Sequence, residues 1–214
     1  MHDVLSHFGD ILAGFRVTLE LAFLGFLGAL IIGTVMAVFR VSPITPLRVI
    51  GAVYVEFFRN IPLLALLILF VFGLPDIGIT FSLFWCGAAG LALAGAAFVC
   101  ESMRGGINAV SVGQAEAARA IGLTFTQSLR FVILPQAFRT MVQPLVNTFI
   151  GVALGSSLVS AVGVSDLTYQ TQYLNLKYAQ ATAGFLVAGA LYMLLAFAGV
   201  GVGSWLERRL AIRR

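Results

Sequence analysis

The side chains able to do acid, base or nucleophilic chemistry are few and scattered along this chain. Its only histidines are His2 and His7, and no long apolar segment contains an aspartate. The two cysteines, Cys86 and Cys100, share one apolar segment without a CxxC spacing or a neighbouring histidine, which predicts packing rather than metal binding. No GxxxxGK[ST] loop is present to hold nucleotide phosphates. The sequence therefore excludes an ATP-hydrolysing component and argues against an enzyme.

Two carboxylates have an arginine three residues later, at the spacing of a pair on one helix face. Glu101 precedes Arg104 and Glu56 precedes Arg59, and we favour structural ion pairing for both over contact with a substrate. A third carboxylate, Glu20, lies inside an apolar segment, where ionisation is costly unless the group reaches water, a partner or a cavity. We expect Glu20 to be interfacial, with a place on a solute path as the alternative.

Uncharged polar side chains gather in a later apolar segment. Their hydroxyl and amide groups would suit the wall of a path for a polar solute, and hydrogen bonding between helices explains them nearly as well. Pro144 in the same segment would allow a helix to bend. The candidates for such a path are Asn147, Thr148, Ser156 and Ser157.

The elements that must position these residues are membrane helices. Of the 214 residues, 60% are hydrophobic and 10% are charged, whereas an ordinary soluble domain has about 25% charged residues. Five segments approach the ~20 apolar residues that cross a bilayer. We therefore expect an all-α, polytopic membrane protein with one domain, residues 1–214, and spans at Val17–Phe39, Val53–Leu74, Phe81–Met103, Met141–Val164 and Ala181–Leu206.

The cations predict how the chain is oriented. Five spans place the two termini on opposite sides, and one side would then carry all of the 13 lysines and arginines except Arg16 and Lys177. By the positive-inside rule, the N-terminus is expected outside, and the C-terminus and the polar insert 104–140 are expected in the cytoplasm. This distribution also explains the net charge of +4 without a nucleic-acid partner.

The insert 104–140 is predicted to contain two short helices joined at a glycine. Segments Ser111–Gln114 and Thr124–Gln127 each have the spacing of a capping box, so a helix should begin at each. Gly122 suits the left-handed turn that ends the first helix, and Pro135 should disturb the end of the second. From the pattern alone, these helices either pad the inner membrane face or present the slender, alanine-rich first helix to another protein.

This insert resembles the EAA loop of permease subunits in ATP-binding-cassette (ABC) importers. The matching positions are Glu116-Ala117-Ala118, Gly122 and Leu134-Pro135, with Val132 where isoleucine is usual. From about residue 40 onward, the chain is similar to five-helix permeases for polar amino acids, especially glutamate, glutamine, histidine or arginine. It departs from them at residues 154–157, where Leu-Gly-Ser-Ser replaces a Lys-Asp or Lys-Asn pair followed by hydroxyl residues.

The resemblance implies a transport subunit in the plasma (inner) membrane of a prokaryote, without cofactors of its own. Implied partners are two cytosolic ATPase subunits that bind ATP and magnesium, a second permease chain, identical or related, an extracellular amino-acid-binding protein and membrane lipid. Glutamate is the favoured cargo, with glutamine or basic amino acids next. The loop implies ATPase coupling by Glu116, Ala117, Ala118, Arg119, Gly122, Leu134 and Pro135.

Two alternatives from other classes were weighed against the importer. An ion-coupled secondary transporter usually has functional charges at the bilayer centre and interrupted helices in related halves, and no such pairing is visible here. An integral-membrane enzyme, such as an intramembrane protease, would need a buried nucleophile and base. Uptake that persists without a nucleotide-hydrolysing partner would favour the secondary transporter.

Overall fold

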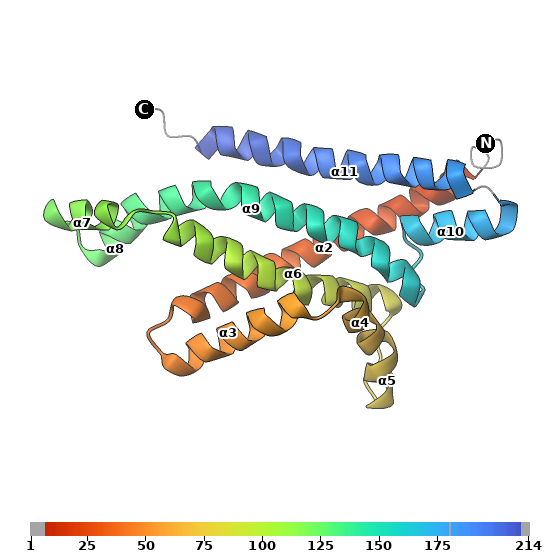
Figure 1. Ribbon diagram of the computed structural model, residues 1–214, viewed down its shortest axis with the longest axis horizontal. Coiled ribbons are helices and arrows are strands. Elements are labelled where there is room, and N and C mark those ends of the chain that lie inside the picture. Colours follow the sequence, from red (N-terminus) through yellow and green to blue (C-terminus); the bar gives the residue numbers. More distant parts are fainter. Residues whose placement is uncertain (1–6, 180, 211–214) are drawn as a thin grey trace.

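The computed structural model describes residues 7–179 and 181–210, and all of its regular elements in these ranges are helices (Figure 1). Three of these elements, labelled η, are π or 3₁₀ turns that join longer helices. The elements are α2 (Phe8–Val41), α3 (Thr45–Asn60), α4 (Leu63–Ile68), η1 (Leu69–Gly73), α5 (Leu74–Asp76), α6 (Leu83–Asn108), α7 (Val112–Ala120), α8 (Phe125–Ser128), η2 (Leu129–Ile133), α9 (Leu134–Gly155), η3 (Ser156–Val162), α10 (Leu167–Tyr178) and α11 (Ala181–Leu210).

Four continuous helical segments are long and apolar enough to cross a membrane. They are Phe8–Val41, Leu83–Asn108, Phe125–Val162 and Ala181–Leu210. A bent pair, Thr45–Asn60 with Leu63–Asp76, provides a fifth crossing if it is counted as one span. The all-α, polytopic fold predicted from the sequence is therefore confirmed.

The second predicted span, Val53–Leu74, is wrong as a single straight helix. Helix α3 ends at Asn60 and the chain turns by 101° before α4 begins at Leu63. Pro62 explains the break, because its ring pushes the preceding residue out of the helical region, and Ile61 is extended with φ −81° and ψ 131°. A hydropathy window reports composition rather than direction, so it does not detect this bend.

The fourth predicted span begins much earlier than expected. A helix runs through α8, η2, α9 and η3 from Phe125 to Val162, so Pro135 does not end it. The proline occupies the first turn of α9, directly after the π turn η2, where a wider ring of hydrogen bonds accommodates the missing N–H. At about 1.5 Å per residue, these 38 residues reach ~57 Å, well beyond the apolar thickness of a bilayer.

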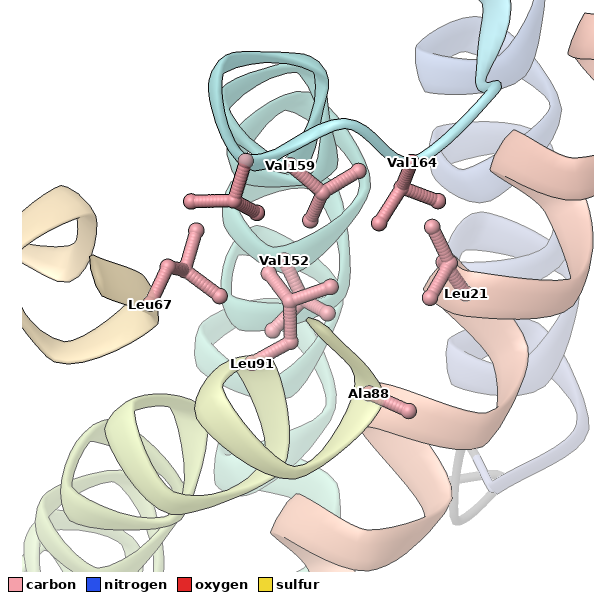
Figure 2. Close-up of a cluster of buried hydrophobic side chains, with 8 residues drawn as sticks. Leu21, Leu67, Ala88, Leu91, Val152, Val159 and Val164 are labelled. Atoms are coloured by element: carbon pink, nitrogen blue, oxygen red, sulfur yellow. The ribbon is translucent and has the colours of Figure 1, made fainter. Parts of the chain in front are cut away.

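Helices α2 and α6 form the centre of the molecule and are in close contact. A Cβ added to Gly28 would lie 2.8 Å from the Cβ of Ala92, and one added to Gly33 would lie 2.7 Å from the Ala96 carbonyl oxygen. Small residues thus permit the close backbone approach on which helix packing in a membrane depends. Around this pair, aliphatic side chains from five elements meet in the cluster of Figure 2: Leu21, Leu67, Ala88, Leu91, Val152, Val159, Val162 and Val164.

A buried polar cluster fixes α10, a helix that the sequence did not predict. The Asp166 carboxylate caps α10 by accepting a hydrogen bond from the Tyr169 amide at 2.9 Å, and it accepts a second from the Tyr192 hydroxyl at 3.1 Å. The Leu167 amide donates to the Thr18 hydroxyl of α2 at 3.1 Å. These bonds tie α10 to α2 and α11 at the end of the molecule opposite α7 (Figure 1).

Burial raises the pKa of the Asp166 carboxyl, and the hydrogen bonds that it accepts oppose part of that rise. The folded protein therefore binds the Asp166 proton more tightly than the unfolded chain does. The stability that this group contributes is complete below its ordinary pKa and is lost as the pH rises through its folded pKa.

Candidate functional site

A cavity of about 480 Å³ lies where α3, α4, α6 and α9 meet, and we call it the central cavity. Arg59 is the single charged residue among its described lining residues, and Asn147 and Thr148 add an amide and a hydroxyl. The rest of the wall is apolar or glycine: Phe58, Ile61, Leu63, Leu91, Ala94, Gly95, Phe98, Gly151 and Val152. The central cavity thus combines an apolar wall with a few polar groups, as small-solute sites do.

The structure separates the four polar candidates of the later apolar segment into two pairs. Asn147 and Thr148 line the central cavity. Ser156 and Ser157 do not: their hydroxyls donate to the carbonyl oxygens of Ala153 and Leu154 in the same helix, each at 2.7 Å. A 3₁₀ turn places each hydroxyl beside the carbonyl three residues earlier, so both serines lie outside the central cavity, and their place on a solute path stays a prediction.

Glu20 also lies outside the described cavities. Its carboxylate accepts a hydrogen bond from Arg16 Nε at 2.8 Å, one turn earlier on α2, and both side chains are exposed. The ion pair satisfies the charge on the helix surface. Glu20 thus lies in an ion pair on the surface of α2, and both its interfacial position and its place on a solute path stay predictions.

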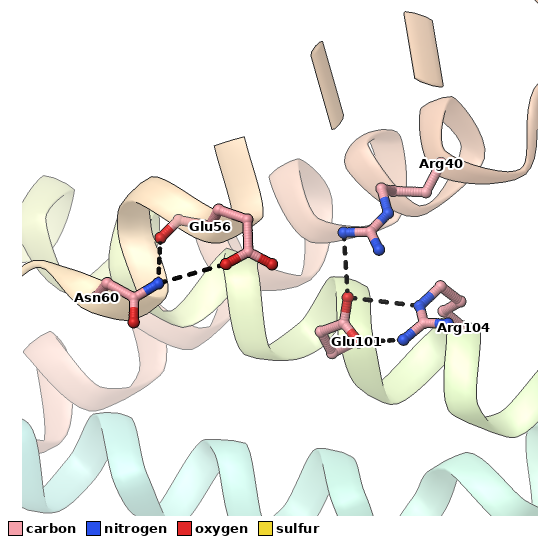
Figure 3. Close-up of polar contacts among 5 residues, drawn as sticks. All are labelled: Arg40, Glu56, Asn60, Glu101 and Arg104. Atoms are coloured by element: carbon pink, nitrogen blue, oxygen red, sulfur yellow. Dashed lines mark hydrogen bonds and ion pairs between the residues drawn. The ribbon is translucent and has the colours of Figure 1, made fainter. Parts of the chain in front are cut away.

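A second cavity of about 420 Å³, which we call the lower cavity, adjoins the central one toward α7. Glu101 lies in its wall and accepts a hydrogen bond from Arg104 Nη2 at 2.6 Å, as its spacing predicts. Figure 3 shows a second arginine, Arg40 of α2, beside the same carboxylate, with Nη1 3.2 Å from Oε1. Sequence reasoning missed Arg40, because its partner is 61 residues away and no periodicity links them.

The predicted pair of Glu56 with Arg59 is wrong. The Glu56 carboxylate lies 3.5 Å from the Asn60 side-chain nitrogen, one turn later on α3 (Figure 3). The Arg59 guanidinium instead lies over the Phe98 ring, with Cζ 5.8 Å from the ring centroid. Three-residue spacing allows an ion pair on a helix surface. Here Arg59 instead points into the cavity wall and contacts the aromatic ring of α6.

Helix α7 presents most of the residues of the EAA match to the exterior. Glu116, Ala117 and Arg119 are exposed, whereas Ala118 is buried at 3% exposure where α7 packs against η2 and α8. Leu134 is half-buried, and Pro135 is exposed at the start of α9. Sequence reasoning overlooked three apolar neighbours that are 70% exposed or more: Val112, Ile121 and Phe125.

The ends of α7 differ in part from the prediction. Ser111 precedes the helix, but its side chain makes no capping hydrogen bond, so the first capping box is wrong in detail. The second is confirmed: the Gln127 amide donates to Thr124 Oγ1 at 3.3 Å, and Gln127 Oε1 accepts from the Thr124 amide at 2.9 Å. Gly122 has φ +85°, and its amide donates to the Arg119 carbonyl at 3.0 Å, as a glycine C-cap requires.

Comparison with known proteins places this geometry in a family. Residues 25–212 match the model for the binding-protein-dependent transport system inner membrane component. The chain belongs to this family. The permease is 35% identical over 208 residues to the probable glutamine ABC transporter permease protein GlnM of Bacillus subtilis, with 97% of this chain and 96% of that protein covered.

Two further relatives agree with this assignment. The glutamate transport system permease protein GluC of Corynebacterium glutamicum is 34% identical over 219 residues, with 96% of each chain covered. A chain in the crystal structure of an amino acid ABC transporter with histidines has a TM-score of 0.90 and 32% identity over 97% of both chains. The MetNI methionine ABC transporter, at 24% identity and a TM-score of 0.71, shares the fold.

Family membership decides between the classes that the sequence left open. The resemblance to ABC importer permeases is confirmed, and the chain is a multi-pass component of a bacterial inner membrane. It is a transport subunit rather than an enzyme. The secondary transporter and the membrane enzyme are therefore set aside.

Proposed function

We propose that this permease forms the membrane path of an ABC importer for a polar amino acid, with glutamate as the favoured cargo. Relatives that are named for glutamine, glutamate and arginine transport support an amino acid. The observation that carries the choice among them is the central cavity, in which Arg59 is the single charged lining residue described. A cation in an apolar wall favours a carboxylate and disfavours a cationic side chain.

The polar groups of the central cavity suit the parts of an amino acid. Among the described residues, no carboxylate lies within ion-pair distance of Arg59, so its planar guanidinium is available for bidentate binding of a solute carboxylate. Thr148 donates its hydroxyl hydrogen to the Pro144 carbonyl at 2.9 Å, which leaves its oxygen lone pairs to accept from an ammonium group. Asn147 can both donate and accept.

Coupling to ATP hydrolysis is assigned to the α7 end of the molecule. The exposed Glu116, Ala117 and Arg119, with the bare apolar side chains of Val112 and Ile121, make a surface suited to a groove on an ATPase. The positive-inside count supports a cytoplasmic position for this end. The partners are then two ATPase subunits that bind ATP and magnesium, a second permease chain, and an extracellular amino-acid-binding protein at the opposite face.

The cargo is tested by ATP-driven uptake into proteoliposomes that contain the complete complex with its binding protein. We expect labelled glutamate to accumulate only with ATP inside, and a tenfold excess of unlabelled arginine to compete far less than glutamine does. Arg59→Gln should raise the KM for glutamate by about tenfold or more, since hydrogen bonds to charged groups are worth about 1.5–3 kcal/mol. Arginine uptake at the glutamate rate would refute the cargo assignment.

The coupling surface is tested with a matched pair of alanine substitutions. Ala117→Trp adds bulk to the exposed surface of α7, whereas Ala13→Trp adds the same bulk to an exposed position of α2 at the other end. We expect the first variant to lose co-purifying ATPase and uptake, and the second to keep both. Normal assembly and uptake with Ala117→Trp would remove the docking role from α7.

A further inference from the structure

The central and lower cavities share three residues of their walls. Arg59 of α3, Phe98 of α6 and Thr148 of α9 line both. Along α6, the central cavity takes residues 91–98 and the lower cavity takes residues 98–109, and along α9 the order from α7 is likewise lower cavity first. The three shared side chains therefore stand at one level, between the middle of the molecule and its α7 end.

Two of these side chains lie in contact across the junction. The Arg59 guanidinium is held over the Phe98 ring, with 5.8 Å between Cζ and the ring centroid. The Glu101 carboxylate in the wall of the lower cavity is already paired, because it lies between Arg40 and Arg104 (Figure 3). Arg59 thus has an aromatic partner at the junction; it interacts with Glu101 electrostatically, but among the described residues it forms no ion pair within 4.0 Å.

We propose that Arg59 and Phe98, with Thr148 opposite them, form the gate between the two cavities. In the closed state the arginine rests on the ring and blocks the passage from the central to the lower cavity. A solute carboxylate that binds Arg59 competes with the ring for the guanidinium and so loosens this contact. The gate thereby responds to binding of the proposed cargo. This role of Arg59 rests on the proposed function.

A bend beside Arg59 and a proline before Thr148 give the backbone two places at which the gate could open. Arg59 lies in the last turn of α3, immediately before the 101° bend at Ile61 and Pro62, so a change in that bend would move it relative to α6. Thr148 belongs to the continuous helix that begins at Phe125 beside α7, and Pro144 lies one turn before it. A push on α7 therefore reaches one wall of the gate through a single helix.

The gate is tested first by cysteine labelling, which does not depend on the identity of the cargo. Gly151 of the central cavity and Gly105 of the lower cavity are matched positions, because a Cβ at either would have no neighbour within 4 Å. Each is changed to cysteine in the complete complex, with the buried Cys86 and Cys100 replaced by alanine. A membrane-impermeant maleimide is supplied from the α7 side of the membrane.

We expect Gly105→Cys to react and Gly151→Cys to be protected in the resting complex. Adding Phe98→Ala should speed the labelling of Gly151→Cys by about fivefold or more and leave that of Gly105→Cys unchanged. Phe98→Tyr, which keeps the aromatic ring, should retain the protection. Equal labelling of both positions with Phe98 intact, or no change with Phe98→Ala in a complex that assembles normally, would overturn the gate.

Uptake kinetics separate the failure of the gate from that of the proposed cargo. Because Phe98→Ala removes one side of the gate, it should increase the ATP-independent leak of preloaded glutamate severalfold. Arg59→Lys, which retains the charge, should change the KM for glutamate less than Arg59→Gln does. A KM effect of Arg59→Gln without any effect of Phe98→Ala on leak or labelling would leave the cargo proposal standing and refute the gate. Labelling as predicted without glutamate uptake would refute the cargo and leave the gate.

Discussion

Gly122 is the position at which a single methyl group should disturb the turn after α7 most selectively. Its φ of +85° lies in the left-handed region, and a Cβ added there would have no neighbour within 4 Å. The cost of Gly122→Ala is therefore backbone strain alone, about 1–2 kcal/mol, without a steric clash. This strain should destabilise the turn after α7. Two hydrogen bonds close that turn, from Gly122 N–H to the Arg119 carbonyl at 3.0 Å and from Leu123 N–H to the Ala118 carbonyl at 3.1 Å.

Hydrogen exchange of the α7 amides in the purified permease measures this effect. A loss of 1–2 kcal/mol corresponds to about 5–30-fold faster exchange through local opening. The control is Gly113→Ala in the first turn of the same helix, where a Cβ also has open space. That change should slow exchange by about twofold, because glycine within a helix costs about 0.5 kcal/mol relative to alanine. Equal exchange in both variants would refute the assignment of the turn to Gly122.

Three further outcomes follow from polar contacts elsewhere. Glu101→Gln removes the charge between two arginines, so the free energy of unfolding should fall by about 2 kcal/mol, which an unchanged Tm would contradict. The native permease should lose Tm as the pH rises above 3.8, the ordinary pKa of the Asp166 carboxyl. The Asp166→Asn variant should lack this decline, because the asparagine side chain cannot ionise. An equal decline in both proteins would exclude Asp166 as the cause. Ser156→Ala and Ser157→Ala should each alter the KM for uptake by less than about twofold. A tenfold change would instead support contact of these serines with the solute.

Local patterns predicted those features that depend on near neighbours in the chain. Hydropathy over some 20 residues located the apolar segments, because the bilayer selects for length and composition rather than for particular contacts. The capping box at Thr124 and the turn at Gly122 were readable for the same reason, since the bonding groups lie within five residues of each other. The pair of Glu101 with Arg104 is another contact within one helical turn.

Contacts between distant segments followed a different rule. Both Pro62 and Pro135 were visible in the sequence, yet one breaks a span and the other lies inside a continuous helix, because Pro62 follows an extended Ile61 whereas Pro135 follows the π turn η2. The spacing that paired Glu101 correctly failed for Glu56, since the Phe98 ring and the cavity wall hold Arg59 instead. Such competition among partners has no signature in the spacing of residues along a helix.

By itself, the sequence determined that this chain is an α-helical membrane permease with an EAA segment, since composition, periodicity and a short motif are all local properties. The tertiary structure alone decided which polar groups line the central cavity. It placed Asn147, Thr148 and Arg59 around the central cavity and turned the hydroxyls of Ser156 and Ser157 back onto their own helix. A side chain faces a cavity only where helices from distant parts of the chain leave space between them, and that space is a property of their packing.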